Sequence, residues 1–186
     1  MRFDGAIAVV TGAGSGIGKA AAVRLAKEGA RVILAGRTLS RLEGTAGEIN
    51  NLCRREAAYF FQTDVTKESS VQELARYVEG NFGDLHVLVN NAGGSAQTRI
   101  LETPEKVWDD VQAVNLKSVF LVSKELGKIM AAGVKKEILD KRNRSIVNIA
   151  SLSGHQAGAH IPHNSSTKAA VINFTKSLAL ECLHSG

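Results

Sequence analysis

Short apolar runs alternate with longer amphipathic stretches along most of this chain. Five runs are rich in β-branched or aromatic residues: 6–10 (AIAVV), 30–35 (ARVILA), 57–61 (AAYFF), 85–89 (LHVLV) and 144–150 (RSIVNIA). Continuous apolar runs of this length are typical of strands that are covered on both faces. The pattern therefore predicts five strands of a buried parallel sheet.

Apolar residues recur at helical spacing between these runs. Residues 17–28 predict a helix that stops at Gly29, and residues 66–82 predict another that stops before Gly83. Glycine often ends a helix because it adopts the left-handed conformation without strain. Both segments are predicted to be crossover helices between parallel strands.

The second half of the chain predicts two more helices. Thr103 and Pro104 predict the start of a long one, with the threonine hydroxyl as its cap and proline in the first turn. Its apolar stripe comprises Trp108, Val111, Leu116, Phe120 and Leu126. A last helix is predicted over residues 165–183.

This alternation of strands and helices predicts an α/β fold, a doubly wound parallel sheet with right-handed crossovers. In such sheets, ligands bind at the carboxyl ends of the strands. The sequence has no evident internal repeat or interdomain linker, so residues 1–186 are predicted to form a single domain.

Composition excludes several classes of protein. With 44% hydrophobic and 22% charged residues, the chain is predicted to be globular rather than disordered. Its first residues do not form a secretory signal, and no run approaches the ~20 apolar residues of a membrane helix. Cys53 and Cys182 are far apart and are predicted to be reduced thiols. We therefore expect a soluble, cytoplasmic protein without a membrane partner.

The net charge of +5 and the pI near 9.4 raise the question of nucleic-acid binding. Much of the excess lies in one stretch without interleaved aromatic residues: Lys135, Lys136, Lys141, Arg142 and Arg144. Such a stretch is typical of a solvated loop. We therefore expect no nucleic-acid partner.

A glycine-rich turn follows the first predicted strand and opens the first predicted helix. It consists of Thr11, Gly12, Ala13, Gly14, Ser15, Gly16, Ile17 and Gly18. In this position, glycines let backbone amides approach a pyrophosphate, and the helix dipole favours the anion. The turn therefore predicts a dinucleotide site. A plain tight turn is the alternative, but it would not require so many positions without side chains.

The spacing T-G-x-x-x-G-x-G resembles that of the short-chain dehydrogenase/reductase family. Two more motifs occur in the family's order, namely Asp64 and Val65 after the third strand, and Asn90, Asn91, Ala92 and Gly93 after the fourth. The resemblance implies a Rossmann fold with strand order 3-2-1-4-5. It also implies that Asp64 and Val65 contact the adenine and that the second motif closes the floor of the nucleotide site.

The residues after the second strand favour NADP(H), with NAD(H) as the less favoured alternative. An acidic side chain there would hydrogen-bond the ribose 2′-hydroxyl and repel a 2′-phosphate. The position is Gly36, followed by Arg37 and, one turn on, Arg41. The space around the ribose 2′ position is therefore open and positively charged, as in NADP-preferring relatives. Arg37 is predicted to contact the 2′-phosphate. The alternative is that both are ordinary surface arginines.

The family's catalytic pattern is a serine, a tyrosine thirteen residues later and a lysine four residues beyond, with an asparagine on the preceding long helix. In this register, the resemblance aligns Ser151 with the serine, Lys168 with the lysine and Asn115 with the asparagine. It implies that Ser151 orients a substrate carbonyl and that Lys168 also holds the cofactor ribose. Asn164 occupies the tyrosine position, and both tyrosines of the chain lie far upstream.

Asn164 changes the expected chemistry. A carboxamide has no pKa near neutrality and does not deliver the proton that follows hydride transfer. The sequence therefore predicts an NADP(H)-binding oxidoreductase that acts on a small carbonyl or alcohol with impaired chemistry. The alternative is a catalytically silent nucleotide-binding module of an oligomer or regulatory complex.

Two other possibilities stay open at this stage. His163 titrates in the right range to supply the proton, although adjacent side chains point in different directions. A conjugated enoyl or dienoyl thioester is a possible substrate, since some relatives that reduce such double bonds also lack the tyrosine.

His155, His160 and His163 lie close together in sequence. Their spacing matches no helical i, i+4 pair, and no cysteine or carboxylate lies among them. We therefore expect a polar loop on the substrate side and no metal.

Relatives in this family continue beyond the position of Gly186, with two more strands and a segment that covers the substrate. Without these strands the fifth predicted strand would lie at an open edge. The sequence therefore predicts either a fragment or a homo-oligomer. Candidates for an oligomer interface on the last helix are Ala169, Ile172, Leu178 and Ala179, although core packing explains the same residues.

Overall fold

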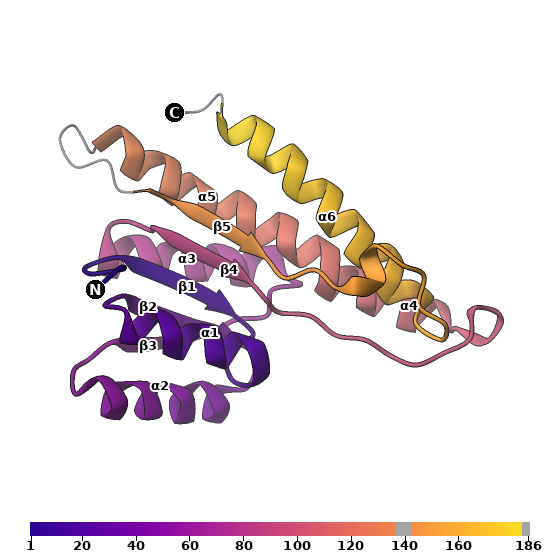
Figure 1. The fold of residues 1–186 in the computed structure, drawn as a ribbon, viewed down its shortest axis with the longest axis horizontal. Coiled ribbons are helices and arrows are strands. Elements are labelled where there is room, and N and C mark those ends of the chain that lie inside the picture. Colours follow the sequence, from indigo (N-terminus) through magenta and orange to yellow (C-terminus); the bar gives the residue numbers. More distant parts are fainter. Residues whose placement is uncertain (137–142, 184–186) are drawn as a thin grey trace.

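The sheet has the predicted order and direction. The computed structural model describes residues 1–136 and 143–183. The strands are β1 (Ile7–Thr11), β2 (Arg31–Gly36), β3 (Ala58–Gln62), β4 (Val87–Asn90) and β5 (Ser145–Asn148). They form one parallel sheet in the order β3-β2-β1-β4-β5 (Figure 1). The predicted α/β class and strand order are confirmed, and all carboxyl ends lie at one edge.

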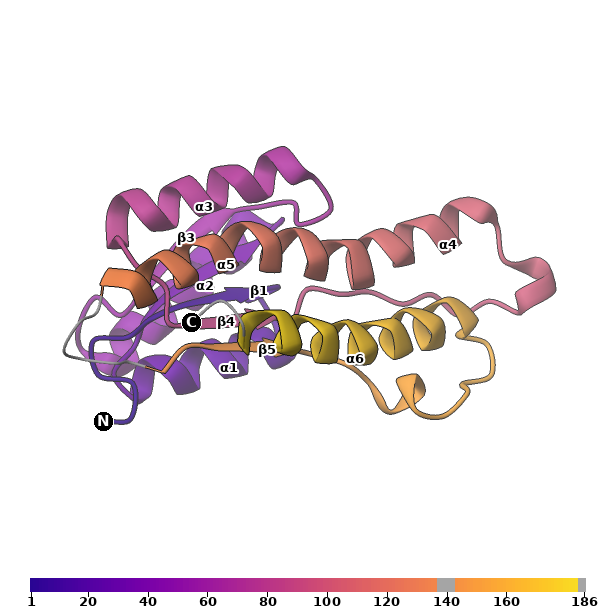
Figure 2. The same cartoon turned by 90° about the horizontal axis from the view of Figure 1, so that it is seen from above.

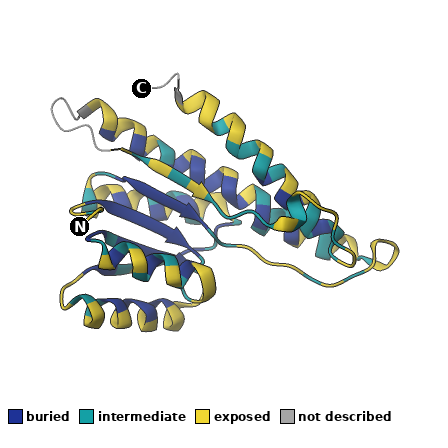
Figure 3. Cartoon of the chain, in the orientation of Figure 1, coloured by how far each residue is buried: buried dark blue, intermediate teal, exposed yellow. Residues whose placement is uncertain are grey.

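The strands differ in how far they are covered. Every residue of β1 and β4 is buried, because each has a strand on both sides. In β3 and β5, at the two edges of the sheet, alternate residues are exposed (Figure 3). Within the described residues, β5 pairs with β4 alone, and Val147 is 44% exposed. The prediction of strands covered on both faces is therefore right for the centre of the sheet and wrong for its edges.

Helices cover both faces of the sheet (Figure 2). They are α1 (Gly16–Lys27), α2 (Leu39–Cys53), α3 (Glu68–Phe82), α4 (Glu105–Gln112), α5 (Ser118–Lys136) and α6 (Pro162–Leu183). Two short 3-10 segments, η1 (Ile100–Glu102) and η3 (Leu152–Gly154), and a π-helix, η2 (Ala113–Lys117), complete the elements. Among the described helices, none combines the length and apolar content needed to cross a bilayer.

The sheet contributes to two separate apolar cores. Val9 and Ile33 belong to the core under α3 and α5, whereas Val10 and Leu34 belong to the core under α1 and α2. Successive side chains of a strand point to opposite faces, so each central strand supports both layers. This packing on both faces holds the carboxyl ends of the strands in fixed positions.

The predicted helix ends agree closely with the structure. Gly83 follows α3 with a left-handed φ of +72°, and Gly29 lies just beyond α1 with a φ of +108°. The predicted starts are less accurate, because α3 begins at Glu68 and α6 begins at Pro162.

The start of the long helix is a correction. α4 begins at Glu105, and the described residues supply no side-chain hydrogen bond to cap it. The Thr103 hydroxyl instead donates to Arg99 O at 2.8 Å and lies 2.7 Å from Thr98 Oγ1. The preceding residues form the 3-10 segment η1, and the Thr103 hydroxyl therefore points back toward the start of this segment and not toward α4. The helix is also interrupted, since η2 separates α4 from α5.

Arg144 corrects the prediction of a solvated basic loop. Its side chain is 7% exposed, and its Nη2 donates to Asp84 Oδ2 at 2.6 Å. A buried cation needs such a carboxylate, and the pairing depends on a partner far away in sequence. Lys141 and Arg142 lie outside the described residues.

Candidate functional site

The glycine-rich turn lies between β1 and α1, at the carboxyl edge of the sheet (Figure 1). Gly12 has a left-handed φ of +65°, which L side chains rarely adopt. A Cβ atom at Gly18 would collide with Asn91 Nδ2 and would lie 2.5 Å from Gly12 O. These glycines are therefore required by the fold of the turn itself, before any ligand is considered.

The Asn-Asn-Ala-Gly motif is hydrogen-bonded to this turn. Thr11 Oγ1 accepts hydrogen bonds from the amides of Asn91 and Ala92, both at 3.0 Å. Asn91 Nδ2 in turn donates to Thr11 O at 3.0 Å. The structure thus brings together the two segments that the sequence predicts to enclose a nucleotide.

The outer side of the turn is open to a ligand. Gly14 is half-buried, whereas Ser15, Gly16 and Ile17 are exposed, and Ser15 is the N-cap residue of α1. The first turn of α1, which is fully described, contains no acidic side chain. Free amides and the helix dipole at such a terminus favour an anion, so the turn suits a pyrophosphate.

A hollow of about 450 Å³ lies at the ends of β2 and β3. It is lined by Arg37, Gln62, Thr63, Asp64, Lys67 and Ser70. The structure therefore places the predicted 2′-phosphate contact, Arg37, and the predicted adenine contact, Asp64, around one cavity. The side chain of Val65 is buried in the apolar core at 4% exposure. Arg41 lies close to the glycine-rich turn, since a Cβ atom added at Gly14 would lie 2.9 Å from Arg41 Cβ.

Asp64 is held in its ionised form in this hollow. Its Oδ1 accepts hydrogen bonds from the Thr66 amide at 3.1 Å and the Thr66 hydroxyl at 2.7 Å. Burial acts to raise the pKa of Asp64, but these hydrogen bonds and the positive charges of Lys67 and Arg37 lower the pKa below its ordinary value. The cavity therefore presents both signs of charge.

Asn115 connects the nucleotide side of the site to the predicted catalytic residues. It is fully buried in the π-helix η2, an element that often marks functional sites. The Gly94 amide donates to Asn115 Oδ1 at 2.8 Å, and Asn115 Nδ2 donates to Gly94 O at 2.8 Å. A Cβ atom at Gly93 would lie 2.9 Å from Asn115 Oδ1 and 3.8 Å from Lys168 Nζ.

Asn164 is hydrogen-bonded on both sides of its amide. Its Oδ1 accepts from Asn115 Nδ2 at 3.1 Å, and its Nδ2 donates to Ser153 Oγ at 3.1 Å. Ser153 in turn donates to Ser151 Oγ through its amide at 3.2 Å and its hydroxyl at 3.0 Å. Ser153 is not among the predicted site residues, and a second hydroxyl two residues after Ser151 is the signal that marks it.

Lys168 lies on α6, one helical turn after Asn164. It is 9% exposed, and its ammonium group donates to Ile149 O at 2.5 Å. Burial lowers the pKa of Lys168 from its ordinary value. The predicted catalytic residues thus come from η2, the segment after β5 and α6, and they gather at the carboxyl edge of the sheet (Figure 1).

His163 does not have the geometry of a proton donor to this site. Its ring is fully buried, and its Nε2 lies 2.9 Å from Ala96 O and 3.3 Å from the Ala96 amide. It therefore joins the segment after Gly93 to α6. His155 and His160 are exposed, and in the described part of the chain no group of three or more His, Cys, Asp or Glu side chains is placed to hold a metal.

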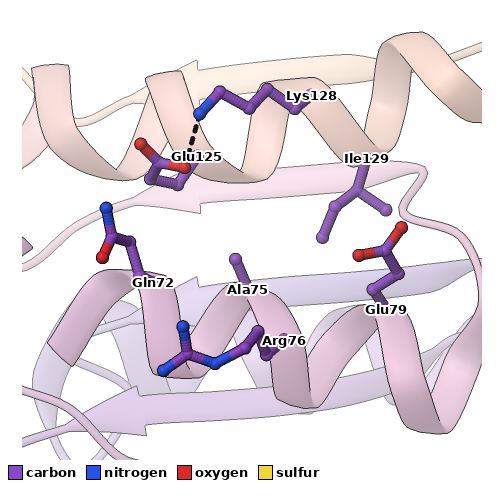
Figure 4. A pocket seen from close by; sticks show the side chains of 7 residues that line it. All are labelled: Gln72, Ala75, Arg76, Glu79, Glu125, Lys128 and Ile129. Carbon is purple, nitrogen blue, oxygen red and sulfur yellow. Dashed lines mark hydrogen bonds and ion pairs between the residues drawn. The ribbon is translucent and has the colours of Figure 1, made fainter. Parts of the chain in front are cut away.

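A second hollow, of about 260 Å³, lies between α3 and α5 (Figure 4). It is lined by Gln72, Ala75, Arg76, Glu79, Glu125, Lys128 and Ile129. Lys128 Nζ donates to Glu125 Oε2 at 2.7 Å, so these two charged side chains of the hollow are paired with each other. Its residues belong to helices that cover the sheet, and this hollow is separate from the candidate site.

Comparison with known proteins gives one consistent family. The chain matches the family model for short chain dehydrogenase over residues 6–186. It is 36% identical over 180 residues to an uncharacterised oxidoreductase of Staphylococcus aureus, covering 97% of this chain and 73% of that protein. It is 32% identical over 186 residues to the 3-oxoacyl-[acyl-carrier-protein] reductase FabG of Vibrio cholerae, covering 100% of this chain and 71% of that protein.

Solved structures share the fold over the full chain. A short chain dehydrogenase/reductase from Burkholderia phymatum in complex with NAD has a TM-score of 0.90 and 31% identity. That match covers 100% of this chain and 63% of the other. An NAD⁺-bound xylitol dehydrogenase has a TM-score of 0.91 and 29% identity, covering 100% of this chain and 68% of the other. The chain thus spans only part of the length of these relatives.

Proposed function

This chain belongs to the short-chain dehydrogenase family, and on that basis we propose that it binds NADP(H) and transfers hydride between the nicotinamide and a small carbonyl or alcohol substrate. The observation that carries the proposal is the position of Gly93 beside the turn that suits a pyrophosphate, where an added Cβ atom would lie 2.9 Å from Asn115 Oδ1 and 3.8 Å from Lys168 Nζ. This geometry joins a nucleotide site to a group of hydrogen-bonding side chains. The nucleotide supplies or accepts the hydride, and the chain binds and orients the reactants.

The preference for NADP(H) is supported by the hollow at the ends of β2 and β3. Arg37 and Lys67 are cations that suit a 2′-phosphate, and Gly36 adds no side chain that would repel it. Asp64 faces the adenine in this proposal, and Val65, whose side chain is buried in the apolar core, contacts it through its backbone. Two of the similar structures hold NAD, so the choice between the nucleotides depends on this chain's own residues.

Titration of NADPH and NADH, followed by nucleotide fluorescence, tests the preference. We expect tighter binding of NADPH, and Arg37→Ala should weaken it about 10- to 100-fold while leaving NADH binding nearly unchanged, because a charge-assisted hydrogen bond contributes about 1.5–3 kcal/mol. Arg76→Ala, on the exposed side of α3, removes the same charge away from the site and serves as the control. Tighter binding of NADH to the native protein would refute the NADP(H) assignment.

The catalytic part of the proposal assigns a role to each side chain near Gly93. Ser151 orients the substrate carbonyl, Lys168 holds the nicotinamide ribose, and Asn115 supports both Asn164 and the Gly94 backbone. Asn164 donates a hydrogen bond in place of a transferable proton. Hydride transfer then proceeds slowly, because positioning survives and general acid catalysis is lost.

A second candidate function is a nucleotide-binding module without catalytic activity. The observation that favours it is the Asn164 amide, which is bonded to Asn115 and Ser153 and carries no titratable group. NADPH oxidation with a panel of diketones and ketoacyl thioesters separates the two functions. Turnover above the rate without protein supports the oxidoreductase, whereas NADPH binding without turnover supports the module.

In either role we propose a homo-oligomer that uses α6. Ala169 and Ala179 are exposed there, and Ile172 and Leu178 are half-buried, so apolar surface remains for a second copy. Sedimentation velocity tests this part, and a stable monomer at high concentration would contradict it.

A further inference from the structure

The backbone fixes the orientation of the Asn115 amide. The Gly94 N–H donates and the Gly94 carbonyl accepts, so Oδ1 of Asn115 faces the N–H group and Nδ2 faces the carbonyl, each at 2.8 Å. Thr167 Oγ1 lies 3.3 Å from Asn115 Nδ2 and accepts from it, because the Thr167 hydroxyl proton is directed to the carbonyls of His163 and Asn164, at 3.0 Å and 2.9 Å. Rotation of this fully buried amide by 180° would break both bonds to Gly94.

The donor-to-acceptor direction of the hydrogen bonds continues from Asn115 through Asn164 to Ser153. Asn115 presents an N–H group to Asn164 at 3.1 Å, so the Asn164 oxygen must accept. Its Nδ2 therefore faces Ser153 and donates to the hydroxyl oxygen at 3.1 Å. This oxygen accepts from Asn164, and the Ser153 hydroxyl donates its own proton to the neighbouring Ser151 Oγ, 3.0 Å away.

Ser151 lies at the end of this chain of hydrogen bonds. Its oxygen receives the Ser153 hydroxyl at 3.0 Å and the Ser153 amide at 3.2 Å. A hydroxyl has two lone pairs and one proton, so both acceptor positions of Ser151 are occupied and only its proton is left to offer. The Asn164 oxygen accepts one hydrogen bond, from Asn115, and its Nδ2 keeps one of its two N–H groups for another partner.

We propose that this chain of hydrogen bonds fixes Ser151 as a donor toward the substrate, which favours a carbonyl oxygen over the corresponding alcohol. A carbonyl oxygen brings lone pairs and no proton, so it matches the free donors of Ser151 and Asn164. An alcohol brings a proton that Ser151 does not accept, because both lone pairs of its oxygen are occupied by Ser153, so the alcohol loses a hydrogen bond at that residue. Ser153 is the positioning residue, because it makes Ser151 a donor. The inference rests on the proposed function for the presence of a substrate and deepens it by favouring reduction.

Neutron diffraction from crystals of the full chain, with its exchangeable hydrogens replaced by deuterium, tests the direction of these hydrogen bonds without cofactor or turnover. We expect the deuterium on Ser153 Oγ to lie toward Ser151 Oγ, and the deuterium on Ser151 to point away from Ser153. A Ser151 deuterium directed at Ser153 Oγ would overturn the proposal. The NADPH titration decides the proposed function independently, so the two failures are distinguishable.

A kinetic comparison tests the consequence for binding. The readout is the KM for cyclohexanol with NADP⁺ divided by the KM for cyclohexanone with NADPH. Ser153→Ala should lower this ratio about tenfold, the effect of one hydrogen bond of about 1.4 kcal/mol, with the dissociation constant of NADPH unchanged. Ser153→Thr keeps the hydroxyl and should restore the ratio, and Ser177→Ala on the exposed part of α6 is the control.

Unchanged ratios in Ser153→Ala would contradict the positioning role, since a residue that only supports the fold would alter NADPH binding and both KM values together. If neither probe is turned over, the neutron result alone confirms or overturns the direction of the bonds.

Discussion

The nucleotide side and the substrate side of the site meet at Gly93, yet they depend on different parts of the chain. On the nucleotide side, the contacts come from the backbone of the glycine-rich turn, braced by Asn91. On the substrate side, four polar side chains form a continuous set of hydrogen bonds, Asn115 to Asn164 to Ser153 to Ser151. A site formed by backbone groups keeps its binding groups when one side chain changes. A site formed by side chains loses a reactive or hydrogen-bonding group with a single substitution.

The two sides also differ in charge. Arg37 and Lys67 give the nucleotide side exposed cations. The substrate side consists of neutral amides and hydroxyls, with Lys168 buried against Ile149 O. Nucleotide binding by charge and backbone is therefore expected to persist where asparagine replaces tyrosine, while proton transfer is not.

The largest expected effect comes from returning a titratable group to the substrate side. Asn164→Tyr should raise the rate of NADPH oxidation with a reducible diketone about 10²- to 10⁴-fold, the usual contribution of a positioned general acid. The rate should also become dependent on pH. Steady-state absorbance of NADPH from pH 6 to 10 measures both effects.

Asn164→Gln is the matched control, because it keeps a carboxamide and should not increase the rate. Equal rates in Asn164→Tyr and the native protein would mean that Asn164 does not limit the rate, and would favour the silent module.

A smaller effect is expected from damage to the nucleotide side. Gly18→Ala places a methyl group against Gly12 O and Asn91 Nδ2, and should lower the free energy of unfolding by about 1–3 kcal/mol through overpacking. NADPH binding should weaken as well, because the turn moves. Urea unfolding and fluorescence titration measure the two changes.

Gly80→Ala serves as the control for this substitution. Gly80 lies in α3, and a Cβ atom there meets nothing within 4 Å. Alanine should stabilise the helix by about 0.5–1 kcal/mol and leave NADPH binding unchanged. A Gly18→Ala protein as stable as the native one would show that the turn is looser than its contacts indicate.

The smallest expected effect concerns Asp64. Folding lowers its pKa below the ordinary value of 3.8, so the ionised form stabilises the fold at pH values above that of the unfolded group. This contribution is lost as the pH falls through the lower pKa of the folded protein. Asp64→Asn should therefore cost less than about 1 kcal/mol at neutral pH, because the group is partly exposed, and nothing in strong acid.

Urea unfolding of both proteins at neutral and acidic pH provides the measurement for Asp64. A difference in stability that stays constant down to strong acid would show that Thr66 recognises the oxygen atom and not its charge.

Most of the fold is predictable from the sequence because the central strands are continuous apolar runs. α2 is the exception, since no bounds for it are predicted from the sequence. Its buried residues, Leu42, Thr45, Ala46 and Ile49, have helical spacing. Gly44 and Gly47 lie among them, and the buried threonine is polar, so the helical repeat of apolar residues is hard to recognise in the sequence.

The nucleotide side of the site was more accessible to sequence reasoning than the substrate side. A run of glycines between a strand and a helix has a local physical meaning, and Arg37 follows directly after β2. The bond between Asn164 and Ser153 joins residues 11 positions apart, and its direction depends on Gly94, far upstream. Such directions follow from tertiary contacts and have no local pattern.

The π-helix η2 makes the length of the chain around Asn115 as important as its composition. A π-helix bonds residues five apart where an α-helix bonds residues four apart, so Ala113–Lys117 takes up one more residue than regular winding would, and deleting one residue there would let α4 and α5 join as one regular helix. Asn115 would then lose the widened turn that holds its amide against Gly94. A single-residue deletion here would therefore be more disruptive than most substitutions, and this stretch should tolerate changes of residue type far better than changes of length.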